Sequence, residues 1–197
     1  MLDFVMRDIG RIVRLQIQRS SLKTGDKPNR VYDPAPLLPV PRLAVSPEGV
    51  LGEAADHSWV VDIHHGAHPD TKNPDGQHGV SLGFTTHYAA MRDRFGDRIT
   101  LGCAGDNILV EADRRFELED LGSGVALRSA SGADLVRLSV LDVAHPCRPF
   151  TGWALGGRVE TEALKSHLQF LDGGTRGFYC LGVGCGIVAV GDRVVLL

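Results

Sequence analysis

The sequence predicts a mostly β protein with a few helices, folded as a closed or nearly closed β-barrel. The chain of 197 residues contains many short apolar runs, and its 24 glycines divide them at frequent intervals. Short strands separated by turn residues are typical of barrels and sandwiches, and the few helical segments are expected on the outside. With 43% hydrophobic and 23% charged residues, the chain suits one domain with a good-sized core.

The first element is a strand over residues 10–19. Val13, Leu15 and Ile17 alternate with polar residues, so we expect these three on one buried face. Residues 33–41 contain four prolines, which cannot donate to a sheet ladder or continue a helix. We therefore expect an extended connector on the surface, with a partner-binding polyproline segment as the alternative.

The middle of the chain alternates strands with one helix. A strand at residues 59–63 enters a loop, rich in Gly, Pro, Asp and Asn, that runs from His64 to Gly79. Thr86 is placed to cap a helix that continues to Phe95 with one apolar stripe. Further strands are expected at residues 107–111, 124–129 and 134–143.

The C-terminal part reads as a helix followed by strands. The helix opens at Thr161 with leucines at helical spacing, and Gly173 and Gly174 stop it. Residues 178–183 and 186–197 are expected to form paired strands, the second folded at Gly191 and Asp192.

Composition argues against several classes of protein. The net charge is -3 and no run of Lys or Arg occurs, so no nucleic-acid partner is expected. No apolar stretch reaches membrane-spanning length, and the N-terminus lacks the order of a signal peptide, so we expect no membrane association. The four cysteines, which form no CxxC pair, indicate reduced thiols and a cytoplasmic location.

Cys147 lies in the most informative segment of the chain, His145 to Phe150, directly after an apolar run. Two prolines flank the cysteine, which predicts a stiff and accessible loop. The neighbouring Arg148 favours the thiolate, the form that acts as nucleophile and metal ligand. The alternative is an incidental or buried cysteine, as most unpaired cysteines are.

Several segments, taken in order, resemble the MOSC domain family, named after the C-terminal domain of molybdenum-cofactor sulfurases. The resemblance covers about residues 50–197, after the first strand and connector of residues 10–45. Where the family often has Arg two residues before its cysteine, this chain has His145. The matching segments are Asp62 to Gly66, His87 to Met91, Gly105 to Glu111, Cys147, Gly173 to Tyr179, Gly186 to Val188 and Gly191 to Val194.

The resemblance implies one small barrel domain over residues 1–197 that binds molybdenum cofactor, with Cys147 as metal ligand and catalytic residue. It also implies that Asn107 and His65 face the cofactor or substrate pocket. Asp106, directly before Asn107, is a further cofactor-binding candidate. Asp-Asn after Gly also commonly makes a turn by side-chain to backbone bonding, and both roles can hold together.

Two activities are open under this resemblance. One is the reduction of N-hydroxylated compounds, and the other is sulfur transfer through a persulfide on Cys147. Either needs a small-molecule substrate and a separate electron or sulfur donor, which the sequence does not identify. A homodimer that covers the pocket is also compatible with the sequence.

Candidate contacts for the phosphate of a pterin cofactor come from Arg148 and Arg176, because guanidinium pairs bidentately with phosphate. Thr175 lies in a glycine-rich turn whose backbone N–H groups can face an anion.

Two alternative functions remain at this point. The chain could be a carrier of cofactor or sulfur without chemistry of its own. It could also be a zinc-dependent hydrolase, since His64 and His68 have the i,i+4 spacing of a helical metal site. Gly66 and Pro69 argue against the helix that such a site needs.

Overall fold

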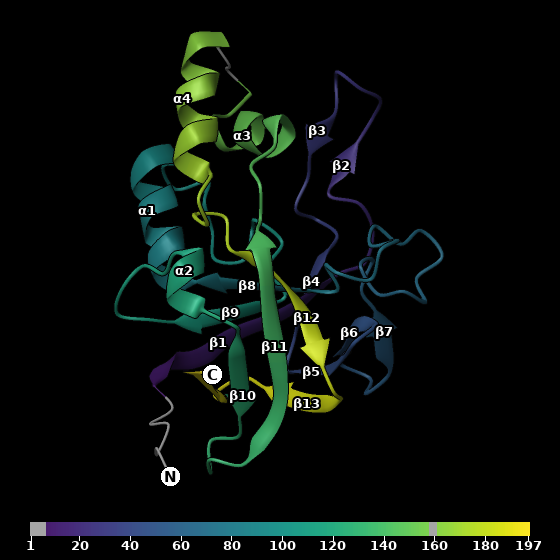
Figure 1. Ribbon diagram of the computed structural model, residues 1–197. Coiled ribbons are helices and arrows are strands. Elements are labelled where there is room, and N and C mark those ends of the chain that lie inside the picture. The colour runs from purple at the N-terminus through teal and green to yellow at the C-terminus, as the bar shows by residue number, and fades with distance from the viewer. Residues whose placement is uncertain (1–6, 158–160) are drawn as a thin grey trace.

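A seven-stranded β-barrel, closed by the pairing of β1 with β14, forms the centre of the molecule (Figure 1). The computed structural model describes residues 7–157 and 161–197. The predicted mostly β barrel is confirmed. All neighbouring strands are antiparallel except β8 and β9, which are parallel. In order round the wall, the strands are β1 (Asp8–Gln18), β9 (Ile108–Glu111), β8 (Val80–Phe84), β12 (Phe178–Val183), β11 (Asp134–Val143), β10 (Val125–Arg128) and β14 (Arg193–Leu196).

A second sheet of four strands packs against the barrel, and its apolar residues join the barrel core. Gly52 allows the close approach, because a Cβ there would lie 2.8 Å from Ile17 and 2.9 Å from Val40. The strands, in sheet order, are β13 (Gly186–Ala189), β5 (Arg42–Ser46), β6 (Gly49–Glu53) and β7 (Trp59–Val61).

The expected pairing of residues 178–183 with 186–197 is wrong. Strand β12 pairs with β11 and β8, whereas β13 pairs with β5 and β14 pairs with β1 and β10. The fold of the last segment at Gly191 is confirmed, since the chain turns there between β13 and β14. Each of these strands gains apolar contacts with distant segments that a hairpin with its neighbour would not provide.

The helices gather at one end of the barrel, with the hairpin of β2 (Lys23–Thr24) and β3 (Val31–Tyr32) beside α3 (Figure 1). The predicted helices at 86–95 and from Thr161 are confirmed. Thr86 is not the cap, however, because its hydroxyl donates to the carbonyl of Arg114. Each described helix is too short or too polar to span a membrane. They are α1 (Thr85–Phe95), α2 (Leu118–Leu121), α3 (Arg148–Ala154) and α4 (Thr161–Leu171).

The alternation predicted for the first strand breaks at Val13. The register of β1 against β9 shifts between Ile12 and Arg14, and this bulge turns Val13 to the other face. As a result, Ile12, Leu15 and Ile17 lie in the barrel core. Val13 instead packs against the apolar cluster under the helices.

The proline-rich segment is not only a connector. Residues Leu37–Val40 form β4, which pairs with β1 and lies at the end of the strand order. Pro39 is exposed on this edge strand, where proline is tolerated because one side of the strand has no ladder to satisfy. The expectation that residues 33–41 stay outside the sheet is therefore wrong for β4.

A buried polar network joins the barrel strands to the loop after β7. The amide nitrogen of Asn107 donates to the carbonyl of Gln16 at 3.2 Å and to Asp62 Oδ2 at 3.0 Å. Its oxygen accepts the backbone N–H and the hydroxyl of Ser81 at 3.0 and 2.9 Å. Asp62, fully buried, also accepts the N–H of Gln18 at 2.6 Å. This Asp62–Asn107 network connects β1, β8, β9 and the loop.

Replacing Asn107 with Asp should test the network. The Asn107→Asp variant loses both amide donors and places a second buried carboxylate against Asp62. We expect the free energy of unfolding, measured with urea, to fall by about 3 kcal/mol. Asn29→Asp, on the exposed hairpin tip, is the matched control and should change stability little. Equal stability of the two variants would contradict the proposed role of the network.

Candidate functional site

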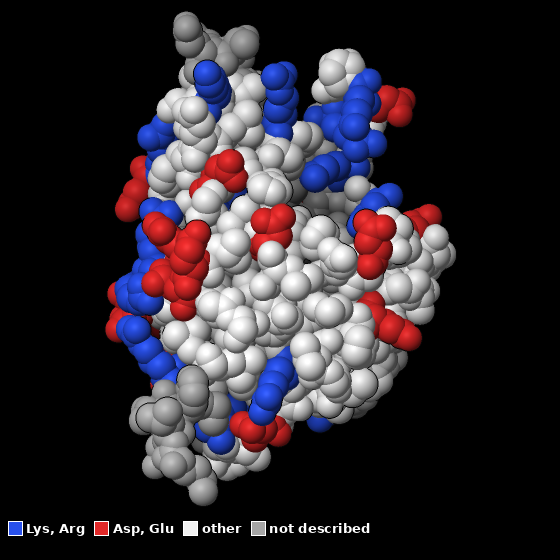
Figure 2. Space-filling model, viewed as in Figure 1, with Lys and Arg blue, Asp and Glu red and all other residues white. Residues whose placement is uncertain are grey.

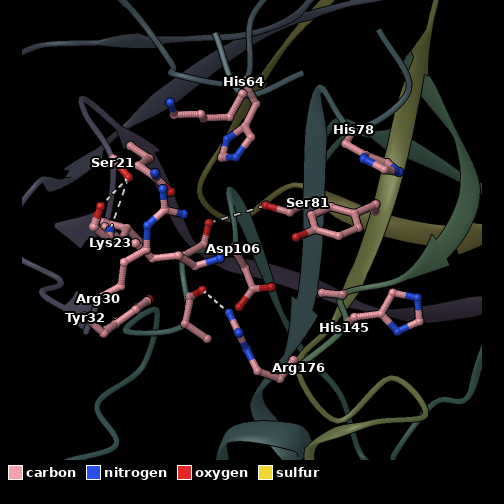
Figure 3. Close-up of a pocket in the computed structure, with 17 residues that line it drawn as sticks. Ser21, Lys23, Arg30, Tyr32, His64, His78, Ser81, Asp106, His145 and Arg176 are labelled. Atoms are coloured by element: carbon pink, nitrogen blue, oxygen red, sulfur yellow. Dashed lines mark hydrogen bonds between the residues drawn. The ribbon is translucent and has the colours of Figure 1, made fainter. Parts of the chain in front are cut away.

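A cavity of about 440 Å³ opens between the β2–β3 hairpin, the loop of residues 64–79 and the strand ends below α3 (Figure 3). We call it the basic cavity, because four cationic side chains line it. Asp106 is the one carboxyl group among its described lining residues. The cations are Lys23, Arg30, Lys72 and Arg176, and the histidines are His64, His78 and His145. This lining suits an anionic ligand.

Asp106 is held tightly at the cavity wall. A Cβ at Gly83 would lie 2.8 Å from its Cγ, and one at Gly177 would lie 2.5 Å from its Oδ1, so only glycine leaves room. The hydroxyl of Tyr88 donates to Asp106 Oδ2 at 2.5 Å. Burial raises the pKa of Asp106 to about 6, although the Tyr88 hydrogen bond and the charge of Arg176 lower it. Its charge can therefore change near neutral pH.

Arg176 lies between the cavity and α3. Its Nη2 donates to the carbonyl of Ala104 at 2.6 Å, and its guanidinium stacks over the ring of Phe150 at 4.1 Å. Its Nε is buried and has no hydrogen-bond partner within the described protein. Burial alone lowers the pKa of Arg176, but nearby Tyr32 and Cys147 help to raise it. Arg176 therefore holds a positive charge with one donor unused.

Cys147 occupies the junction between β11 and α3, where it is the N-cap residue. Its carbonyl accepts both the N–H and the hydroxyl of Thr151 at 3.0 Å. The side chain is partly exposed, and the preceding Ala144 and His145 line the basic cavity. Part of the side chain also packs against the apolar cluster under the helices.

The other predicted site residues do not line the basic cavity. The side chain of Asn107 makes its hydrogen bonds to other members of the Asp62–Asn107 network. His65 is buried, and its Nδ1 accepts a backbone N–H two residues later. Thr175 is also buried and accepts a hydrogen bond from Arg115 at 2.8 Å. Arg148 is exposed and lines a separate hollow. Of the predicted residues, Asp106 and Arg176 line the cavity, whereas Cys147 does not line it and follows the lining residue His145 by two positions.

The histidine loop does not form the helix of a zinc hydrolase. Residues 63–70 follow successive turns and bends, as Gly66 and Pro69 predicted. His64 Nδ1 lies 3.0 Å from Asp62 Oδ1, and His68 Nδ1 accepts a backbone N–H. Across residues 7–157 and 161–197, no group of three or more His, Cys, Asp or Glu side chains is placed to hold a metal ion.

Sequence reasoning missed the contribution of the hairpin. Lys23, Arg30 and Tyr32 all come from it and line the cavity. Tyr32 anchors it, because its hydroxyl donates to the carbonyl of Cys103 at 2.7 Å and its ring meets Phe150 edge-on at 5.1 Å. The Gly-Asp-Lys-Pro-Asn turn before Arg30 was the available signal.

Comparison with known proteins identifies related sequences and folds. A family model described as MOSC domain matches residues 63–195. The YuaD protein from Bacillus subtilis is 14% identical with a TM-score of 0.55, covering 96% of this chain and 94% of its own. YiiM from Geobacillus stearothermophilus is 16% identical with a TM-score of 0.51, covering 98% and 75%. YiiM from Escherichia coli is 13% identical with a TM-score of 0.52, covering 81% and 64%. No curated protein sequence matches the chain.

The accessibility of the cysteines predicts a labelling pattern. Cys103 and Cys180 are buried, and burial raises the pKa of the Cys103 thiol to about 12 and that of Cys180 further. Iodoacetamide should therefore modify Cys147 and Cys185 in the native protein and spare the other two, because the thiolate is the reactive form. Peptide mass spectrometry reads the result. Labelling of Cys180 as fast as Cys147 would show that the barrel opens readily.

The carboxyl group of Asp106 predicts a pH dependence of stability. Its pKa is about 6 in the folded state, against an ordinary value of 3.8. Between these values the native protein holds a proton that the unfolded chain has lost, so stability falls as pH rises, by at most about 3 kcal/mol. Asp106→Asn keeps an oxygen that can accept the hydrogen bond from Tyr88. In this variant the free energy of unfolding, measured with urea, should change less between about pH 4 and pH 7. Asp97→Asn, at an exposed site, is the matched control and should leave the pH dependence unchanged. The same pH dependence in Asp106→Asn as in the natural protein would refute the assignment.

Proposed function

The chain belongs to the MOSC domain family, and from this premise we propose that it binds a molybdenum cofactor through Cys147 and the basic cavity, and reduces N-hydroxylated compounds. The family is associated with binding of this cofactor. One observation carries the proposal: four cationic side chains line a cavity whose wall includes His145, two residues before the partly exposed Cys147.

The basic cavity fits the anionic part of such a cofactor. Its pterin component carries a phosphate, which pairs well with guanidinium and ammonium groups. Lys23, Arg30 and Lys72 line the cavity, and Arg176 adds a buried Nε without a partner. A buried donor without an acceptor costs free energy. A ligand oxygen that accepted a hydrogen bond from Arg176 Nε would remove this cost.

Cys147 is the cysteine best placed to be a metal ligand. Cys103 and Cys180 are buried, and Cys185 lies in the turn between β12 and β13, at the end of the barrel opposite the helices (Figure 1). A thiolate is a suitable ligand for a redox-active metal whose electronic properties it adjusts. When bound, the cofactor would supply two-electron redox chemistry.

The histidines of the cavity can hold protons for the reaction. Reduction of an N–OH group takes up two electrons and two protons and releases water. His64 is oriented by the 3.0 Å contact of its Nδ1 with Asp62, and Figure 3 shows its ring pointing into the cavity. His145 lies at the rim, where its ring nitrogens approach Asp142 and Asp172 at 3.5 and 3.4 Å.

The electrons would come from a separate donor, because the chain has no flavin, iron–sulfur or nicotinamide motif. The lining favours cofactor binding over a simple sulfur carrier. A persulfide on Cys147 carries at most one negative charge and has no need of four surrounding cations.

Metal content tests the cofactor proposal directly. Protein made in a host that synthesises molybdenum cofactor should contain molybdenum near one equivalent, measured by plasma mass spectrometry. Cys147→Ser should retain less than about a tenth, because the thiolate ligand is lost. Cys185→Ser is the matched control and should load like the natural protein. Full loading of Cys147→Ser would refute the ligand assignment.

Activity then separates an enzyme from a carrier. Loaded protein should reduce benzamidoxime to benzamidine when reduced methyl viologen supplies electrons. Molybdenum at one equivalent without such reduction would identify a carrier.

A further inference from the structure

A second hollow, of about 480 Å³, lies between the β2–β3 hairpin and α3. Arg30 and Tyr32 of the hairpin line both this hollow and the basic cavity. Figure 2 shows a notch between the helical end and the hairpin, with basic side chains on the hairpin side. The hairpin is thus a wall with a ligand-sized space on each face.

The segment that carries Cys147 passes between the two spaces. Ala144 and His145, before the cysteine, line the basic cavity, and Arg148 and Pro149, after it, line the second hollow. Cys147 itself lines neither space, but its chain neighbours on one side line the basic cavity and those on the other side line the second hollow.

The second hollow combines cations with flat apolar surfaces. Arg30, Arg98 and Arg148 line it, and all three are exposed. The guanidinium of Arg98 lies 5.9 Å from the ring of Trp153, whose indole forms part of the wall. Val31 is 60% exposed and adds an apolar surface beside the three arginines. Among the described residues, no acidic side chain lines this hollow.

We propose that the second hollow binds a planar aromatic molecule that carries a phosphate, with a nucleoside monophosphate as the representative ligand. The aromatic part would pack against Trp153 and Val31, and the phosphate would pair with Arg98 and Arg148. The volume lies in the range of small-molecule sites. Binding of this ligand in the hollow is independent of the proposed function. A reaction of the ligand at Cys147 would rest on the proposed function.

Tryptophan fluorescence can report binding at this position. The chain has two tryptophans, so Trp59→Phe leaves Trp153 as the sole emitter. Titration of this variant with adenosine monophosphate should quench the emission saturably, and adenosine or inorganic phosphate alone should bind at least about tenfold more weakly. Absence of saturable quenching up to millimolar nucleotide would overturn the proposal.

Substitutions then locate the ligand. Arg98→Ala and Arg148→Ala should each weaken binding about tenfold, because each removes a charge-assisted contact to phosphate. Arg137→Ala, at an exposed site on β11, is the matched control. Lys72 lines the basic cavity and not the second hollow, so Lys72→Ala tests for binding in the basic cavity. Weakening by Lys72→Ala but not by Arg148→Ala would place the nucleotide in the basic cavity and refute the proposal.

Protection of Cys147 tests its position between the two spaces. Saturating adenosine monophosphate should slow alkylation of Cys147 by iodoacetamide several-fold and leave Cys185 unaffected. Unchanged alkylation of Cys147 would remove the link between the hollow and the cysteine. These measurements use protein without cofactor, so they succeed or fail independently of the molybdenum assay.

Discussion

The buried pairing of Asp62 with Asn107 is the interaction on which the rest of the site depends. Asp62 is fully buried, and N–H groups from three segments of chain surround it. A buried carboxylate is stable only when such donors satisfy it, so the network leaves β1, β9 and the loop after β7 one relative arrangement. His64 lies two residues after Asp62, and Asp106 lies directly before Asn107. The network therefore brings both side chains to the same cavity.

Charge is distributed unevenly over this chain. The net charge is -3, yet the basic cavity collects four cations around a single carboxyl group. That carboxyl group, Asp106, is enclosed between Gly83 and Gly177, and its burial raises its pKa to about 6. Among the described lining residues, the cations outnumber this one carboxyl group, so the cavity is locally basic even though the molecule as a whole is acidic. Local arrangement, not composition, decides what the cavity attracts.

The hairpin shows how a short exposed segment can organise function. Tyr32 attaches it by a hydrogen bond to Cys103 and by ring contacts with Phe150 and Trp153, and Leu22, directly before β2, is buried in the same apolar cluster. Through this anchor, the hairpin presents Arg30 to the cavity on one face and the hollow on the other. Loops and hairpins on a rigid barrel commonly carry binding residues, since the scaffold supplies the stability that they lack.

The barrel class, most strands and both long helices could be predicted from the sequence, because they depend on local alternation and turn residues, and short motifs pointed to Asp106 and Arg176, which line the cavity. Which strands pair is set by the closed barrel, since β12, β13 and β14 each find partners far away in the chain. The fold also determines that Lys23, Arg30 and Lys72 share a cavity with Arg176, and that Asn107, His65 and Thr175 turn into the protein. A side chain's direction depends on strand register, and the grouping of distant charges depends on closure of the barrel, neither of which any local pattern records.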